Sequence, residues 1–82
     1  MALQEGFDPN RLNEIATILK ALSHPSRLLM VEALGEKPYC VCELTAMVGS
    51  DTSTVSKHLA ILRQAGIVTD EKKGNQVFYS LR

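Results

Sequence analysis

The sequence of 82 residues predicts one mainly α-helical domain, residues 1–82, that closes with a two-stranded β-hairpin. Apolar residues recur at helical spacing from Asn10 to Ala65, whereas from Ile67 onward the period changes to about two. Turn-forming residues separate the helical stretches into four. A chain of this length forms a single domain with a thin core, which would gain from a partner subunit.

The first predicted helix covers residues 10–22. Asp8 or Asn10 can cap its start, and Pro9 prevents helix before it. Its apolar residues at helical spacing are Leu12, Ile15, Ala16, Leu19 and Leu22. Together with Ile18, this apolar face could pair with a second copy of the chain, so we expect a homodimer.

The second predicted helix begins near Pro25, because proline suits the first turn of a helix, and it runs to about Leu34 before Gly35. Its pattern predicts a buried set of four residues: Leu28, Leu29, Val31 and Leu34.

A third, short helix is predicted from Cys40 to Val48, with Leu44, Met47 and Val48 facing inward. Gly49 and Ser50 end it, and Asp51 is placed to cap a fourth helix that closes at Gly66. Two short helices joined by a tight turn form a helix-turn-helix arrangement.

The fourth predicted helix has two faces of different chemistry. Val55, Leu59 and Leu62 can pack inward. The opposite stripe consists of Ser53, Ser56, Lys57 and Ala60. No acidic residue occurs from Thr52 to Arg63, although a solvated helix usually mixes carboxylates with its cations. We infer that the intended neighbour is itself negative, and that this helix lies in a DNA groove.

Two β-rich runs follow, residues 67–71 and 76–81, joined by a glycine-containing connection at residues 72–75. The second run places Val77, Tyr79 and Leu81 on one side. An antiparallel hairpin is therefore predicted, and the complete expected fold is a winged helix-turn-helix.

Composition limits the function classes. The net charge is zero, but residues 1–51 hold four basic and seven acidic residues, whereas residues 52–82 hold five and two. The basic charge therefore lies in the half that carries the fourth helix and the hairpin. No signal peptide and no membrane-spanning run is predicted, so we expect a cytoplasmic protein with reduced cysteines and no membrane partner. No catalytic motif occurs, and we expect no enzyme activity.

Four ordered blocks resemble the ArsR/SmtB family of winged-helix repressors. They are Ala21-Leu22-Ser23-His24-Pro25-Ser26-Arg27-Leu28, Cys40-Val41-Cys42-Glu43-Leu44, Ser53-Thr54-Val55-Ser56-Lys57-His58-Leu59 and Leu62-Arg63-Gln64-Ala65-Gly66-Ile67-Val68. The resemblance extends from about Leu12 to Leu81. It implies a homodimer that binds double-stranded operator DNA, with the fourth helix of each subunit in successive major grooves roughly 34 Å apart.

By this resemblance the candidate DNA contacts are Ser53, Thr54, Ser56, Lys57 and His58 on the fourth helix, and Lys72 and Lys73 at the tip of the wing. Simpler interpretations stay open. Ser53 and Thr54 could cap the helix, His58 could be packed inside, and the two lysines could form a solvated tip. The family often has glutamine at the position of Thr52, so adenine readout there is in doubt.

Cys40 occupies the expected cap position of the third helix, with Glu43 three residues later as a capping-box carboxylate. Thiol is a poor cap, and the first turn of a helix lowers thiolate pKa and favours soft metals. On a regular helix Cys40 and Cys42 point about 200° apart, so one ion would bind both sulfurs only if the first turn were distorted. Burial of both as small apolar residues is the alternative.

The resemblance assigns Cys40 and Cys42 as ligands of arsenite or antimonite, the inducer of the arsenic-responsive branch, whose binding releases DNA. No metal is expected to be required for folding. A trivalent arsenic centre prefers three thiolates and the sequence holds two cysteines, so a small thiol, water or a second subunit would complete the site. Since relatives carry their zinc-type site on a helix after the wing, we expect no such site within this sequence.

Three function classes follow. The first is a repressor released by a thiophilic metalloid or metal, the second is a repressor switched by oxidation of Cys40 and Cys42, and the third is a winged-helix module for protein contacts. A disulfide across one residue within a helix would be strained, which disfavours the second class.

Overall fold

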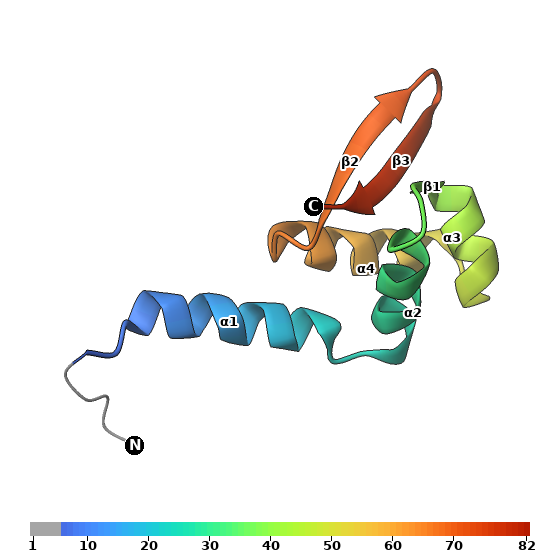
Figure 1. The fold of residues 1–82 in the computed structure, drawn as a ribbon. Coiled ribbons are helices and arrows are strands. Elements are labelled where there is room, and N and C mark those ends of the chain that lie inside the picture. Colours follow the sequence, from blue (N-terminus) through green and yellow to red (C-terminus); the bar gives the residue numbers. More distant parts are fainter. Residues whose placement is uncertain (1–5) are drawn as a thin grey trace.

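The computed structural model describes residues 6–82, which form four helices and a three-stranded sheet (Figure 1). The helices are α1 (Pro9–Leu22), α2 (Pro25–Leu34), α3 (Val41–Val48) and α4 (Thr52–Gln64). The strands are β1 (Tyr39–Cys40), β2 (Val68–Lys73) and β3 (Gln76–Leu81). Helices α3 and α4 form the helix-turn-helix and β2 and β3 form the wing, so the predicted winged helix-turn-helix is confirmed. None of the helices in this described range is long and apolar enough to cross a bilayer.

The helices begin where short polar side chains satisfy free backbone N–H groups. The Asp8 carboxylate accepts a hydrogen bond from the backbone N–H of Asn10 at 3.0 Å, so α1 starts one residue earlier than predicted. The Asp51 carboxylate accepts from the backbone N–H of Thr54 at 2.7 Å and caps α4, as predicted. Gly49, with φ 73°, ends α3 in the left-handed conformation that favours glycine.

Strand β1 was not predicted. It pairs with β3 through Tyr39 opposite Tyr79 and Cys40 opposite Phe78, which places β3 between β1 and β2. The connector before α3 is therefore tied to the wing by backbone hydrogen bonds. Two residues are too short a run for period-two alternation to reveal a strand.

The wing turns over fewer residues than predicted. Lys73 pairs with Gln76, so only Gly74 and Asn75 form the loop, and Gly74 has a φ of 65°. A positive φ at the first loop residue suits the right-handed twist of a two-residue hairpin. Lys72 and Lys73 consequently lie at the end of β2 rather than in the loop.

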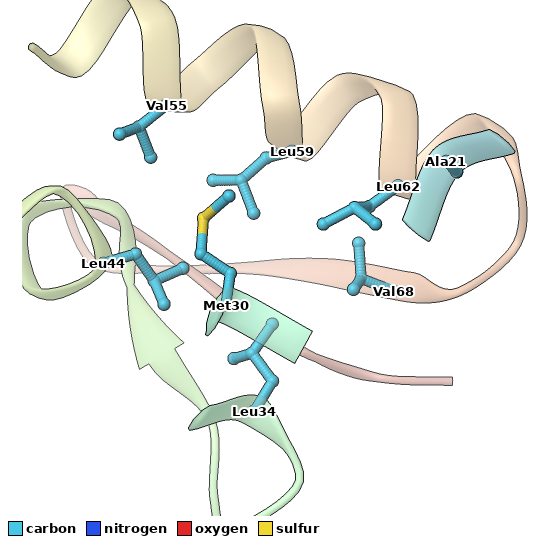
Figure 2. Close-up of a cluster of buried hydrophobic side chains, with 8 residues drawn as sticks. All are labelled: Ala21, Met30, Leu34, Leu44, Val55, Leu59, Leu62 and Val68. Atoms are coloured by element: carbon cyan, nitrogen blue, oxygen red, sulfur yellow. The ribbon is translucent and has the colours of Figure 1, made fainter. Parts of the chain in front are cut away.

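The core lies beneath α4. Val55, Leu59 and Leu62 are fully buried, as predicted, and Figure 2 shows their side chains pointing from α4 toward Met30, Leu44 and Val68. The buried cluster is Ala21, Met30, Leu34, Leu44, Val55, Leu59, Leu62 and Val68. One helix thus supplies three core residues, and its orientation is set by the packing of those side chains.

Some predicted core residues lie at the surface. Leu28, Leu29 and Met47 are 51%, 43% and 40% exposed, whereas Met30 is fully buried. Helix α2 is apolar at successive positions, so periodicity alone could not tell which face packs. The structure selects the face with Met30 and Leu34, one turn apart, and the prediction for Leu28 and Leu29 is wrong.

On α3, Leu44 is buried and Val48 is partly buried against the core, as predicted, while Met47 faces outward. On β3, Val77 and Tyr79 are half-buried, but so is Phe78 of the opposite side, and Leu81 is 39% exposed. Both sides of β3 are therefore half-covered.

Candidate nucleic-acid interface and thiol pair

Helix α4 presents a small, hydroxylated and basic outer face. Ser53, Ser56, Lys57 and Ala60 are all exposed, and Thr54 is half-buried. Because Val55, Leu59 and Leu62 fix the opposite face in the core, these side chains cannot rotate inward without unpacking the domain. The expected stripe is therefore a surface of the folded protein.

The Asp51 carboxylate at the start of α4 is engaged by the helix itself. Asp51 accepts the Thr54 backbone N–H, and this bond is the main cause of a lowered pKa for Asp51, with Lys57 adding a smaller effect. The capping role falls to Asp51 rather than to the hydroxyl of Ser53 or Thr54. Both hydroxyls are therefore free of the alternative task that the sequence left open for them.

His58 differs from the other predicted contacts because it is only 9% exposed. Its Nδ1 lies 3.1 Å from Nη1 of Arg27, and its ring centroid lies 4.5 Å from that of His24. Position 58 is three residues beyond Val55 and faces the α1–α2 junction, not the outer stripe. The prediction that His58 contacts DNA does not fit this position, and the packed alternative describes it correctly.

The wing carries Lys72 and Lys73, both exposed. Nζ of Lys73 lies 5.8 Å from the centroid of the Phe78 ring, within the range of a cation–π contact. The wing leaves the C-terminal end of α4 (Figure 1). There Nη1 of Arg63 lies 3.2 Å from a carboxylate oxygen of Asp70, which joins α4 to β2.

The two cysteines meet at the start of α3. Their sulfur atoms are 2.6 Å apart. Cys40 is the N-cap and has extended backbone angles, φ −79° and ψ 163°, so its side chain does not follow the helical rotation that would separate positions 40 and 42. The extended cap thus brings the two sulfurs together with no ion bound, and the binding of one ion by both stays a prediction.

Glu43 completes a capping box around Cys40. Its carboxylate accepts a hydrogen bond from the backbone N–H of Cys40 at 3.0 Å, and this bond is the main cause of a lowered pKa for Glu43. The expected lowering of the thiol pKa is not found. The Cys42 thiol, and after it burial, raise the pKa of Cys40, and these effects outweigh the lowering by the backbone N–H of Glu43.

The thiol pair suits a thiophilic ion on chemical grounds. Cys42 is exposed and Cys40 is buried, so an ion could approach from solvent and be held on its inner side by Cys40. Within residues 6–82 no group of three or more His, Cys, Asp or Glu side chains could hold a metal. The thiol pair therefore offers two protein ligands within the described residues.

Arg27 and His24 were not predicted as site residues. The His24 imidazole caps α2 through a hydrogen bond from the backbone N–H of Ser26 at 3.1 Å, and Nε of Arg27 donates to the carbonyl of Ala21 at 2.6 Å. They meet His58 across more than thirty residues of sequence, so no local pattern could have revealed the cluster.

The chain matches the family described as "Bacterial regulatory protein, arsR family" over residues 24–70. A biofilm growth-associated repressor of Xylella fastidiosa is 44% identical over 71 residues, which cover 87% of this chain and 62% of the relative. A cadmium resistance transcriptional regulatory protein CadC homolog of Staphylococcus aureus is 38% identical over 69 residues, covering 83% and 57%. The chain thus spans about three-fifths of the length of these curated relatives.

Solved structures agree with the fold. HlyU of Vibrio cholerae superposes with a TM-score of 0.84 and 31% identity, covering 90% of this chain and 80% of that one. The reduced form of the same protein gives a TM-score of 0.82 and 32% identity, covering 88% and 76%. The matching family is one of regulatory proteins, which is what the lack of catalytic motifs predicted. The chain belongs to the ArsR family of bacterial regulatory proteins.

Proposed function

We propose that this protein is a transcriptional repressor that binds double-stranded operator DNA as a homodimer and leaves it when a thiophilic ligand binds Cys40 and Cys42. The observation that carries the proposal is the position of the thiol pair. It sits at the first turn of α3, which packs directly on the α4 helix that presents the basic stripe. Arsenite or antimonite is the ligand we expect first.

The DNA-binding part rests on the surface of α4 and the wing. Ser53, Ser56 and Lys57 are exposed on α4. Thr54, Lys72 and Lys73 complete the proposed contacts, while buried His58 is left out. Hydroxyls can donate to phosphates or base edges, and lysines neutralise phosphates and release counterions. A relative of similar sequence is named a repressor, which supports the same role here.

Salt dependence tests this part. Affinity for a duplex of about 30 bp selected from a randomised library should fall steeply as salt rises. The double variant Lys57→Ala, Lys72→Ala should reduce the logarithmic slope by about 4, because each lysine occurs twice in the proposed homodimer. Lys37→Ala is the matched control, because Lys37 lies over the Tyr39 ring in the connector, away from α4, and should leave the slope unchanged. Undetectable or salt-independent binding would instead favour the protein-contact module.

The release part rests on the geometry at the start of α3. An ion held by both sulfurs would push on Cys40, whose backbone is fixed both to Glu43 and to Phe78 of the wing. Ligand binding there would strain the helix-turn-helix and the wing together. The cadmium resistance regulator among the relatives supports a soft-metal response in general, and thiolates suit such ligands. Arsenite and antimonite are proposed from the resemblance of Cys40-Val41-Cys42 to the arsenic-responsive branch of the family.

Titration of arsenite, antimonite, cadmium and zinc into the protein–DNA complex tests the release. We expect the thiophilic ions to free the DNA from the wild type but not from Cys40→Ser or Cys42→Ser. Thr45→Ser is a control on the same helix, because it keeps the hydroxyl that bonds the Val41 carbonyl. Full release of DNA from both cysteine variants would show that neither sulfur is required for the response.

A redox-switched repressor is the second candidate. Sulfur atoms 2.6 Å apart, with one of them exposed, are placed for oxidation to a disulfide, and a solved relative is described in a reduced form. Peroxide should then release DNA reversibly with dithiothreitol. Release by peroxide and by none of the ions would favour this candidate over the metalloid response.

A further inference from the structure

Beneath the proposed DNA-binding face lies a cluster of Arg27, His24 and His58, of which His58 is buried and the other two are half-buried. It joins three parts of the chain: Arg27 donates through Nε to Ala21 at the end of α1, His24 caps α2, and His58 projects from α4. All described contacts of this cluster lie within the domain and away from the thiol pair. The cluster therefore connects α4, through His58, to the junction between α1 and α2.

The hydrogen bonds fix the protonation state of both rings at Nδ1. Arg27 has no acceptor nitrogen, so the 3.1 Å contact between its Nη1 and Nδ1 of His58 requires an unprotonated Nδ1. Nδ1 of His24 accepts the Ser26 backbone N–H and is unprotonated for the same reason. A proton added at Nδ1 of His58 would break its bond and place two cations against each other.

We propose that His58 and Arg27 are positioning residues which seat α4 for DNA binding only while His58 is neutral, so that acidification loosens this helix and weakens operator binding. The proposal rests on the proposed function, since its DNA part presumes that α4 is the DNA-binding helix. The seating of α4 itself follows from the contacts between His58, Arg27 and Ala21.

No described neighbour supplies a carboxylate that would favour the charged ring. Helix α4 packs against α1, α2, α3 and β2. The groups that act on His58 are Arg27 and His24 at the start of α2. The acidic side chain of α3, Glu43, is bonded at Cys40, and Asp70 of β2 is paired with Arg63. On α1 the charged side chain that lines a common hollow with Arg27 is Lys20, a cation.

The direction of the pKa shift agrees with this geometry. Burial is the main cause that lowers the pKa of His58 below its ordinary value; the neighbouring His24, in its protonated form, and the Arg27 guanidinium act in the same direction. A lowered pKa means that the folded state holds fewer protons on this ring than the unfolded state. The stabilisation is complete above the unfolded pKa of about 6.5 and is lost as pH falls through the lower folded pKa.

Two measurements on the whole chain test the proposal at constant ionic strength. The first is the urea midpoint of unfolding from about pH 8 to about pH 5.5, and the second is affinity for the selected duplex over the same range. We expect wild-type affinity to fall more than that of His58→Gln, by a factor that stays below about ten at about pH 5.5 because the pKa of His58 is lowered. Glutamine keeps an acceptor for Arg27 and has no charge to gain. His24→Asn keeps the cap and should retain part of the pH dependence.

The comparison with His58→Gln separates this effect from the general gain in affinity that acid gives to any DNA-binding surface. Equal pH dependence in wild type and His58→Gln, in both measurements, would overturn the proposal. If the wild type bound no DNA at about pH 8, the proposed function would fail. A urea midpoint that did not depend on pH would overturn the role of His58 in holding α4 in place. An Arg27→Gln variant gives an independent arm, and it should lose pH dependence together with stability.

Discussion

Helices α1 and α4 carry apolar residues at the same helical spacing but use them differently. On α4, Val55, Leu59 and Leu62 are fully buried. On α1, Leu12, Ile15, Ile18 and Leu19 are 37–63% exposed, and Ala21 is the one buried residue of that helix. The apolar face of α4 thus packs against other parts of the same chain, whereas most of the apolar face of α1 does not. Such a row of exposed apolar residues marks an interaction surface, which supports the proposed pairing of α1 with a second copy.

The largest effect on stability is expected for a substitution in the buried face of α4. Leu59→Ala should lower the free energy of unfolding by about 2–5 kcal/mol, because it removes a fully buried side chain and leaves a cavity against Met30. Urea denaturation measures the loss. Ile61→Ala on the same helix is the control: Ile61 is 41% exposed, and its truncation should cost far less. Equal losses would mean that α4 is not seated as described.

The α1 side should respond in association rather than in folding. The double variant Ile15→Lys, Leu19→Lys should weaken self-association by about tenfold or more, roughly 1.4 kcal/mol, while leaving the monomer folded. Sedimentation over a concentration series measures this. Met47→Lys is a matched control with a 40% exposed side chain on α3. A wild type that stays monomeric at micromolar concentration would contradict the proposed dimer through α1.

The start of α4 gives a smaller effect. Asp51→Ala should lower the free energy of unfolding by much less than Leu59→Ala does, because the Thr54 backbone N–H loses its acceptor but stays accessible to water. The pKa of Asp51 is lowered in the folded protein, so the stabilisation it gives is present above its unfolded pKa and is lost as pH falls through the lower folded value. The wild type and Asp51→Ala should therefore converge in urea midpoint in acid. A constant difference at all pH values would contradict this role.

The smallest effect is expected where α4 meets the wing. Asp70→Asn removes the ion pair with Arg63, whose side chain is 60% exposed, so solvent screens the interaction and the cost should stay below about 1 kcal/mol. High salt should erase the difference from wild type. A loss as large as that of Leu59→Ala would show that the wing depends on this pair for its position.

Local patterns were sufficient for much of the fold. The four helices, the cap at Asp51, the inward face of α4 and the hairpin near Gly74 each depend on residues close together in sequence, and all were predictable. The carboxylate-free stripe on α4 and the position of both cysteines at the start of α3 could be predicted for the same reason. Family resemblance then rested on the order of these local blocks.

Long-range contacts decided the rest. Whether Leu28 or Met30 packs inward depends on which side of α2 meets α4, and His58 is buried because Arg27 and His24 arrive from another helix. Strand β1 exists because β3 lies beside it, and the extended backbone at Cys40 turns its sulfur toward Cys42. The sequence by itself determined which segments are helical or extended and which surface is basic. Only the tertiary structure decided which side chains meet, because those contacts join residues that no local period relates.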